Sequence, residues 1–324
     1  MLSSINSILL LATTCYQAIA CLIEDRYPPP GKMIDVGGYS LHLCTAGESG
    51  PTVILEHSLG GIEGYLLLPE IAKHTRVCIY DRAGYGWSDH SPYPRTSAQI
   101  VAELDYLLTQ AEIQPPYILV GNSFGSYNVR LYAQYFPEKV VGMVLTDGLH
   151  ETAMLKMPIH LQCLKLFFLS GFVMSFIGSI LGIVRLLKVM GTFEAIKREL
   201  VKFPEVILKP VKRSFCRPKH WITMSREILN LDVSSRQVEL ANYFDALPIV
   251  SIKAKTFFHP SIWTMFLPLK VANNLRDKMH SEILNLSTDC VEIQANKSSH
   301  FVWIDQPEVI VAAILQILNN CDRN

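Results

Sequence analysis

The segment around Ser123 constrains the fold of this chain more than any other part of it. An apolar, strand-like run at residues 117–120 leads into the pentapeptide G-N-S-F-G at residues 121–125, and a helical pattern follows over residues 127–135. Glycines on both sides permit the sharp, strained turn that lifts a serine hydroxyl above the end of a strand. The segment therefore predicts an α/β fold in which Ser123 is a nucleophile.

A serine nucleophile needs a general base, because the free hydroxyl is a weak nucleophile at neutral pH. His300 lies in a loop between a strand-like run at residues 290–294 and a helical run at residues 309–318. Loops at the carboxyl ends of strands are where open α/β sheets place their sites. Of the ten histidines only His300 has this placement, so we predict that it is the general base.

The oxyanion of an acyl-transfer intermediate is usually held by backbone N–H groups. One donor is expected from Phe124, which follows the nucleophile, and the other from the loop after an early strand. Residues 52–56 are that strand, and the loop after it offers Ser58 or Leu59. The sequence does not choose between these two amides, and the glycines that follow them also suit an ordinary turn.

Several motifs occur in a fixed order along the chain, at residues 53–56, 80–89, 121–125, 143–147 and 298–301. This ordered set, over roughly residues 33–318, resembles the α/β-hydrolase superfamily, in the branch that also holds esterases, epoxide hydrolases, haloalkane dehalogenases and proline iminopeptidases. The chain is also similar to uncharacterised bacterial hydrolases in which a hydrophobic segment precedes a Tyr-Pro-Pro-Pro-Gly linker. The resemblance implies a mainly parallel sheet flanked by helices, with a helical cap inserted before the last two strands.

Three positions depart from the pattern of the superfamily. The first is Glu56-His57, which stands where His-Gly is common and brings a bulky side chain near the expected oxyanion site. Ser299 precedes the histidine where glycine is usual. The strand at residues 248–252 is followed by residues 253–260, which contain no carboxylate where the superfamily often carries its triad acid.

The imidazole of a triad needs a carboxylate that fixes its tautomer and stabilises the imidazolium. Some relatives carry this acid after the preceding strand, and Asp147 occupies that position here. We predict Asp147 as the acid. Asp277 and Asp289 remain alternatives, as does a site without a working acid in which Asp147 only caps the next segment.

The length of the chain allows one catalytic core, formed by two separate segments of the sequence on either side of an inserted cap. We expect an N-terminal hydrophobic segment over residues 1–26, a hydrolase core over residues 27–148 and 247–324, and a helical cap over residues 149–246. The formal net charge of zero gives no footprint for nucleic acid. The eight cysteines lack CxxC or zinc spacing, so we expect no disulfide framework, no metal site and no cofactor.

Two apolar segments raise the question of a membrane. Residues 5–23 carry no charge and are long enough to span a bilayer, which predicts a membrane anchor. A cleaved signal, leaving a secreted or periplasmic protein, and an ordinary amphipathic helix are the alternatives. Residues 164–187 are apolar nearly all round, and residues 185–226 carry eleven Lys or Arg against three Glu. This basic stretch suits either a solvated face or an anionic membrane surface, and a second span at residues 167–184 is a further alternative.

These features predict a serine hydrolase that cleaves an apolar ester through an acyl-enzyme intermediate. An aminopeptidase, thioesterase or lactonase on the same scaffold is an alternative. A catalytically silent ligand-binding protein is another, because the usual acid after the strand at residues 248–252 is absent. The expected partners are a small apolar acyl substrate and a membrane surface. The sequence leaves the substrate and the oligomeric state open.

Overall fold

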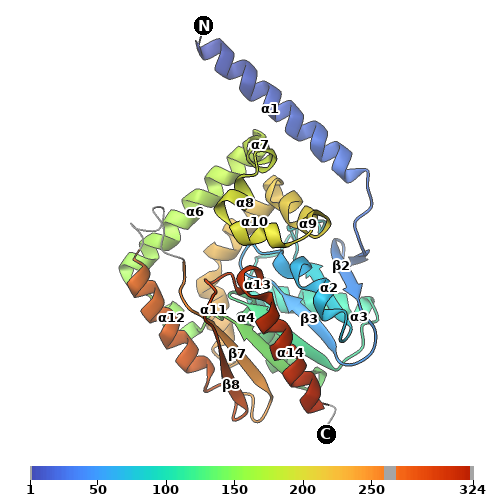
Figure 1. Ribbon diagram of the computed structural model, residues 1–324, viewed down its shortest axis with the longest axis vertical. Coiled ribbons are helices and arrows are strands. Elements are labelled where there is room, and N and C mark those ends of the chain that lie inside the picture. The colour runs from blue at the N-terminus through green and yellow to red at the C-terminus, as the bar shows by residue number, and fades with distance from the viewer. Residues whose placement is uncertain (1, 259–267, 322–324) are drawn as a thin grey trace.

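A computed structural model describes residues 2–258 and 268–321, with side chains from residue 7 onward except at residue 160. Its centre is an eight-stranded sheet in the order β1-β2-β4-β3-β5-β6-β7-β8 (Figure 1). β2 is antiparallel to β1 and to β4, and all other pairs are parallel. The strands are β1 (Lys32–Asp35), β2 (Ser40–Ala46), β3 (Thr52–Glu56), β4 (Val77–Asp81), β5 (Tyr117–Asn122), β6 (Val140–Thr146), β7 (Ile249–Ala254) and β8 (Cys290–Ala295).

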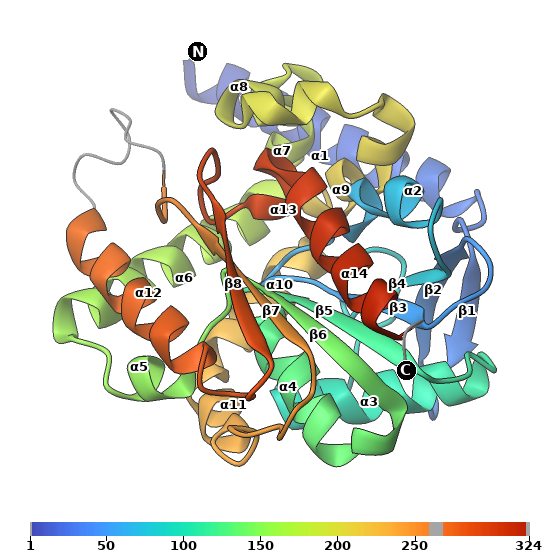
Figure 2. The ribbon, with the colours of Figure 1, turned by 60° about the horizontal axis from the view of Figure 1, so that its bottom comes forward.

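Helices cover both faces of the sheet, so its central strands are buried on both sides. β3, β4 and β5 are buried at every residue, which explains their nearly continuous apolar sequences. One face packs against α3 (Ser97–Gln110) and α4 (Gly125–Tyr135). The other face packs against α14 (Pro307–Cys321), which crosses the sheet in Figure 2. The predicted mainly parallel sheet flanked by helices is confirmed.

A run of helices between β6 and β7, here called the insertion, covers the carboxyl ends of the central strands. Its α-helices are α5 (Glu151–Leu155), α6 (Ile159–Ile180), α7 (Ile183–Val189), α8 (Thr192–Ile196), α9 (Glu205–Phe215), α10 (Pro218–Leu229) and α11 (Leu231–Val238). The apolar run at residues 164–187 is divided between α6 and α7 by Gly182, whose φ of 76° ends the first helix. The basic stretch is not a uniformly solvated face, because four of its cations are buried: Arg185, Lys212, Arg213 and Arg217.

The remaining helices are short or lie at the periphery. They are α1 (Leu2–Asp25), α2 (Leu68–Ile71), α12 (Leu269–Ile283) and α13 (Val302–Asp305), with 3-10 turns at Glu63–Leu66, Pro137–Lys139 and Arg198–Lys202. Within the described part of the chain, two helical segments are long and apolar enough to span a bilayer, Ser7–Asp25 and Leu161–Ile180. The first lies in α1, which runs across the outer side of the insertion beside α7 (Figure 1).

Candidate active site

Ser123 stands in a strained turn between β5 and α4. Its φ is +51°, in the left-handed region that L-residues rarely adopt. The turn is tight because a Cβ on Gly125 would lie 2.4 Å from the carbonyl oxygen of Glu56. The N–H of Ser123 donates to the carbonyl of Thr146 at 2.9 Å, which ties the turn to the end of β6. Glycine at position 125 and this hydrogen bond together explain why the hydroxyl projects above the sheet.

The structure brings the three predicted triad residues together across three strand ends. Ser123 Oγ lies 2.9 Å from His300 Nε2, and His300 Nδ1 lies 2.5 Å from Asp147 Oδ2. An ionised carboxylate can only accept, so the proton that faces Asp147 is carried by Nδ1, which leaves Nε2 to accept from the serine. This is the geometry of a nucleophile, a base and an orienting acid.

The alternative acids lie elsewhere. Asp277 is exposed and pairs with Lys253 at 3.0 Å. Asp289 is exposed before β8. At the end of β7, where the superfamily often carries its triad acid, the N–H of Ala254 donates to Asp147 Oδ1 at 3.2 Å. Of the run at residues 253–260, the last two residues lie outside the described part of the chain.

A second histidine, which the sequence analysis did not predict, contacts the same carboxylate. His280 in α12 places Nε2 at 3.1 Å from Asp147 Oδ1, and its Nδ1 lies 3.2 Å from Ser251 Oγ. Burial alone would raise the pKa of Asp147, but the hydrogen bonds from His280 and His300 outweigh it and lower the pKa. Asp147 therefore stays ionised at neutral pH between two imidazoles.

The predicted oxyanion loop places Leu59 at the cavity and uses the amide of Ser58 within the loop. Leu59 and Phe124 both line the cavity above Ser123. The N–H of Ser58 instead donates to Glu63 Oε1 at 3.2 Å, and Asn122 donates to the same oxygen at 2.8 Å. Of the two alternatives after β3, Leu59 is thus the one that faces the site.

The expectation that His57 crowds the oxyanion site is wrong. Its side chain is fully buried on the far side of the loop, where Nδ1 accepts from Gly64 N–H at 3.1 Å and the ring lies 6.0 Å from that of Trp303. Burial lowers the pKa of His57, so the ring is neutral. Ser299, the other departure beside the site, donates both its N–H and its Oγ–H to Asp305, at 2.9 and 2.7 Å.

The loop after β3 is connected to the insertion through Arg82 and Glu227. Arg82 donates to Glu56 Oε1 and to the carbonyls of His57 and Ser58, at 2.9, 2.9 and 2.7 Å. Glu227 in α10 faces the other side of this guanidinium, with Oε1 at 2.9 Å from Nε and Oε2 at 3.0 Å from Nη2. Arg82 and Glu227 are both fully buried. The insertion is therefore joined to the oxyanion loop by a buried ion pair.

The triad opens into an apolar cavity of about 200 Å³. Helices of the insertion and α12 supply its apolar walls, which include Leu161, Leu164, Phe168, Ile228, Leu275 and Met279. Lys165 and Arg276 also line it, and the Nε of Arg276 lies 3.8 Å from Asp147 Oδ1. Among the described residues, no group of three or more His, Cys, Asp or Glu side chains could hold a metal ion.

Comparisons with known proteins agree with this architecture. Residues 51–172 match the model of the alpha/beta hydrolase fold family. The uncharacterised Bacillus subtilis protein YqjL is 26% identical over 293 residues, covering 88% of this chain and 91% of its own length. An uncharacterised vacuolar membrane protein of Saccharomyces cerevisiae is 35% identical over 114 residues, which are 33% of this chain but only 17% of that protein.

Among solved structures, the enol-lactonase from Burkholderia xenovorans aligns with a TM-score of 0.60 at 14% identity, covering 89% of this chain and 100% of that one. A likeness at this level of identity shows the fold. The matched family segment contains the turn at Ser123 and the strand that precedes Asp147. The chain therefore has the α/β-hydrolase fold, and its match to this family over residues 51–172 indicates a hydrolytic enzyme.

Proposed function

We propose that the protein is a serine hydrolase that cleaves an apolar acyl ester. The observation that carries this proposal is the hydrogen-bonded chain from Ser123 through His300 to Asp147, which opens onto an apolar cavity. Removal of the serine proton by a positioned imidazole is what makes a hydroxyl an effective nucleophile.

The reaction proceeds in two halves. Ser123 Oγ attacks the ester carbonyl while His300 Nε2 takes its proton, and the amides of Phe124 and Leu59 hold the oxyanion. Collapse of the tetrahedral intermediate breaks the ester C–O bond, and His300 returns the proton to the leaving alcohol. Water then attacks the acyl-enzyme with His300 again as base, which releases the acid and restores the serine. Asp147 stabilises the imidazolium in both halves.

The walls of the cavity favour an apolar acyl group over a peptide amine. An aminopeptidase needs a carboxylate for the substrate's free amine. Among the described residues, the carboxylate that lines this cavity is Asp147, which is already bonded to two imidazoles. An epoxide hydrolase or dehalogenase of this superfamily needs an Asp at the position of Ser123. A lactone or thioester would undergo the same chemistry, and the enol-lactonase among the structural neighbours supports a lactone as the second candidate.

The test is hydrolysis of p-nitrophenyl esters of increasing acyl length by the full-length protein. Ser123→Ala should abolish turnover and labelling by a fluorophosphonate, which reacts only with an activated serine. Ser281→Ala is the matched control, because that hydroxyl is exposed on α12 and donates to the carbonyl of Lys278 in the same helix. Undiminished hydrolysis in Ser123→Ala would refute the proposal. If the wild-type protein neither turns over nor takes the label, the fold serves as a silent binding protein instead.

A further inference from the structure

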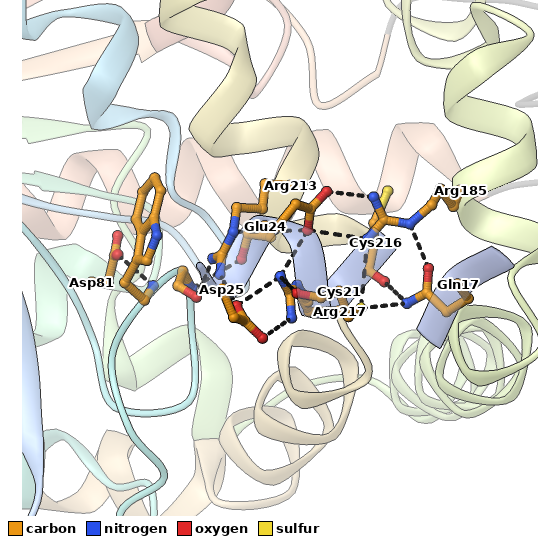
Figure 3. A network of polar contacts seen from close by, with 12 residues as sticks. Gln17, Cys21, Glu24, Asp25, Asp81, Arg185, Arg213, Cys216 and Arg217 are labelled. Atoms are coloured by element: carbon orange, nitrogen blue, oxygen red, sulfur yellow. Dashed lines mark hydrogen bonds and ion pairs between the residues drawn. The ribbon is translucent and has the colours of Figure 1, made fainter. Parts of the chain in front are cut away.

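The carboxyl-terminal half of α1 is joined to the insertion by ion pairs whose arginines are buried, here called the latch (Figure 3). Its members are Gln17, Glu24 and Asp25 from α1, and Arg185, Arg213 and Arg217 from the insertion. Glu24 accepts from Arg185 Nη2 at 3.1 Å and from Arg217 at 2.7 Å. Asp25 accepts from Arg213 at 2.8 Å and from Arg217 at 2.9 Å. Each carboxylate of α1 is thus shared by two guanidinium groups.

Close packing accompanies these charges. Gln17 is only 4% exposed, although most of the apolar side chains of α1 are open. Its amide donates to the carbonyl of Cys216 at 2.7 Å and accepts from Arg185 Nε at 2.6 Å. A Cβ on Gly182 would lie 2.2 Å from the carbonyl oxygen of Thr13, so α1 touches the turn between α6 and α7 at backbone distance. These contacts make α1 a docked helix of the folded body and not a free tether.

The latch also reaches the hydrolase core. Arg213 Nη1 donates to the carbonyl of Gly86 at 3.0 Å, and the guanidinium lies 4.7 Å from the ring centroid of Trp87. The N–H of Trp87 donates in turn to Asp81 at the end of β4, at 2.9 Å. The direction of α1 is therefore fixed relative to the sheet and to the cavity above it.

α6 has two apolar faces with different surroundings. One face lines the cavity through Leu161, Leu164 and Phe168. The other face is open, with Phe167 and Met174 exposed at 63% and 73%. It continues along the helix through further exposed apolar side chains: Ile159, Leu166, Val173, Ile177 and Ile180. A helix that is apolar all round normally lies in a protein core or in lipid.

α1 and α6 both have open apolar sides and contact each other. Only 6% of each candidate span is buried, and α1 contacts both α6 and α7. Exposed apolar residues continue between them on α7, at Ile183, Leu186, Leu187 and Val189. Exposed cations occur on the segments that follow α7, at Arg198, Lys202 and Lys209. Cations beside an apolar face fit the anionic headgroups of a bilayer, whereas a second copy of the chain would present the same positive charges.

We infer that the latch holds α1 and α6 as one lipid-inserting unit, and that the substrate is a lipid acyl ester that reaches Ser123 from the bilayer past α6. The substrate part rests on the proposed serine hydrolase. From its open apolar face we infer that α6 enters the bilayer. From the latch we infer that α6 is coupled to α1. The far side of a lipid-inserted α6 is the wall of the acyl cavity.

The first experiment places a reporter on the open face of α6. Full-length protein carrying Phe167→Trp is reconstituted into phosphatidylcholine–phosphatidylglycerol vesicles with and without brominated lipid, and the native tryptophan signal is subtracted. Leu240→Trp is the matched control, because Leu240 is 77% exposed after α11, away from this surface. We expect the bromine to quench the reporter at position 167 at least threefold more than the one at position 240. Equal quenching at the two positions would overturn the inference that α6 enters the bilayer.

The second experiment breaks the latch from the side of α1. Glu24→Gln/Asp25→Asn in the Phe167→Trp background should leave the protein bound to vesicles through α1 but reduce quenching at position 167 towards that of the control. Glu48→Gln/Glu112→Gln removes two exposed carboxylates and should change nothing. Fluorophosphonate labelling of Ser123 reports whether the latch variant is folded. Full quenching in a latch variant that still labels would overturn the coupling of α1 to α6.

The third experiment separates the substrate from the reaction. Leu166→Gln/Met174→Gln changes side chains on the open face of α6 and spares its cavity face. We expect hydrolysis of a water-soluble butyrate ester to stay within twofold of wild type, and hydrolysis of a vesicle-embedded long-chain ester to fall at least tenfold. Equal loss or no loss on vesicles would overturn the lipid route. Absence of any Ser123-dependent hydrolysis by the wild type would instead refute the proposed function, with the quenching result unaffected.

Discussion

The sheet and the insertion distribute polarity in opposite ways. In the sheet, the strands below Ser123 bury every residue, and their side chains are almost all apolar. In the insertion and α1, many large apolar side chains lie on the outside, whereas Arg185, Arg213, Arg217 and Glu227 are buried. The hydrolase core thus suits an aqueous surrounding, whereas the outer face of the insertion suits a less polar one.

This difference predicts that substitutions destabilise the two regions in different ways. Apolar burial is non-directional, so a core can lose one contact and keep most of its stability. A buried ion pair behaves otherwise, because removing one partner leaves an uncompensated charge. Arg82 with Glu227 is of this second kind. The latch is intermediate, because its arginines are buried but Glu24 and Asp25 are 21% and 55% exposed. The insertion should therefore depend on a few long-range pairs and the core on many ordinary contacts.

The largest expected effect lies at the junction of the two regions, in the carboxylate of Asp147. Asp147→Asn keeps the shape of the site but cannot hold His300 in the required tautomer, so kcat should fall by about 10⁴-fold. His280→Gln is the companion variant, since it removes the second imidazole and leaves the Ser123–His300–Asp147 chain in place; its effect should be far smaller. Steady-state hydrolysis of a soluble ester measures both. Comparable losses would mean that the two histidines act as one unit.

The second prediction compares a buried ion pair with an exposed one. Glu227→Gln leaves the guanidinium of Arg82 buried with one charged partner fewer, and should lower the free energy of unfolding by about 3–5 kcal/mol. Glu70→Gln removes the exposed ion pair with Lys73 and should cost less than about 1 kcal/mol. Urea unfolding of the detergent-solubilised protein measures both. Equal effects would show that the join between insertion and core contributes little.

The sequence predicted the core well because its signals are local. The strand, turn and helix around Ser123 lie within about twenty consecutive residues, and the turn requires glycine at position 125 for a steric reason that the motif itself expresses. His300 was found by its place after a strand, and Asp147 by its place after β6. Strand ends shifted by one or two residues, as expected when hydrogen bonding defines the boundary.

The missed features are all long-range. His280 lies 133 residues from Asp147, and Glu227 lies 145 residues from Arg82. No periodicity within either segment predicts such a partner. The same limit explains the error over His57, because only the packed loop shows that its ring turns towards Trp303. The partners of the basic stretch could not be predicted for a related reason, since the acids that pair with its buried arginines belong to α1, 161 to 193 residues away.

The third prediction concerns the pH dependence of stability, and it tests a residue of the insertion and not of the core. His220 in α10 is fully buried against Tyr85 and Phe215, and burial lowers its pKa to about 3. Below about pH 6.5 the unfolded chain binds a proton that the folded protein refuses, so stability falls as pH falls, by up to about 1.4 kcal/mol per pH unit until about pH 3. Urea midpoints between pH 7 and pH 4 measure the slope. His220→Gln should flatten it, and an unchanged slope would assign it to other groups.

The smallest effect tests the docking of α1 by itself. Gly182 and Gly191 both lie in the insertion with positive φ, at +76° and +72°. Alanine at either position should cost about 1 kcal/mol for the left-handed backbone alone. Only at Gly182 does the added methyl also meet the backbone of Thr13, whereas the space around Gly191 is open. Amide hydrogen exchange in α1 should therefore accelerate several-fold in Gly182→Ala and stay at the wild-type rate in Gly191→Ala. Identical exchange in the two variants would mean that α1 moves independently of the insertion, and the coupling between the two would then have no mechanical basis.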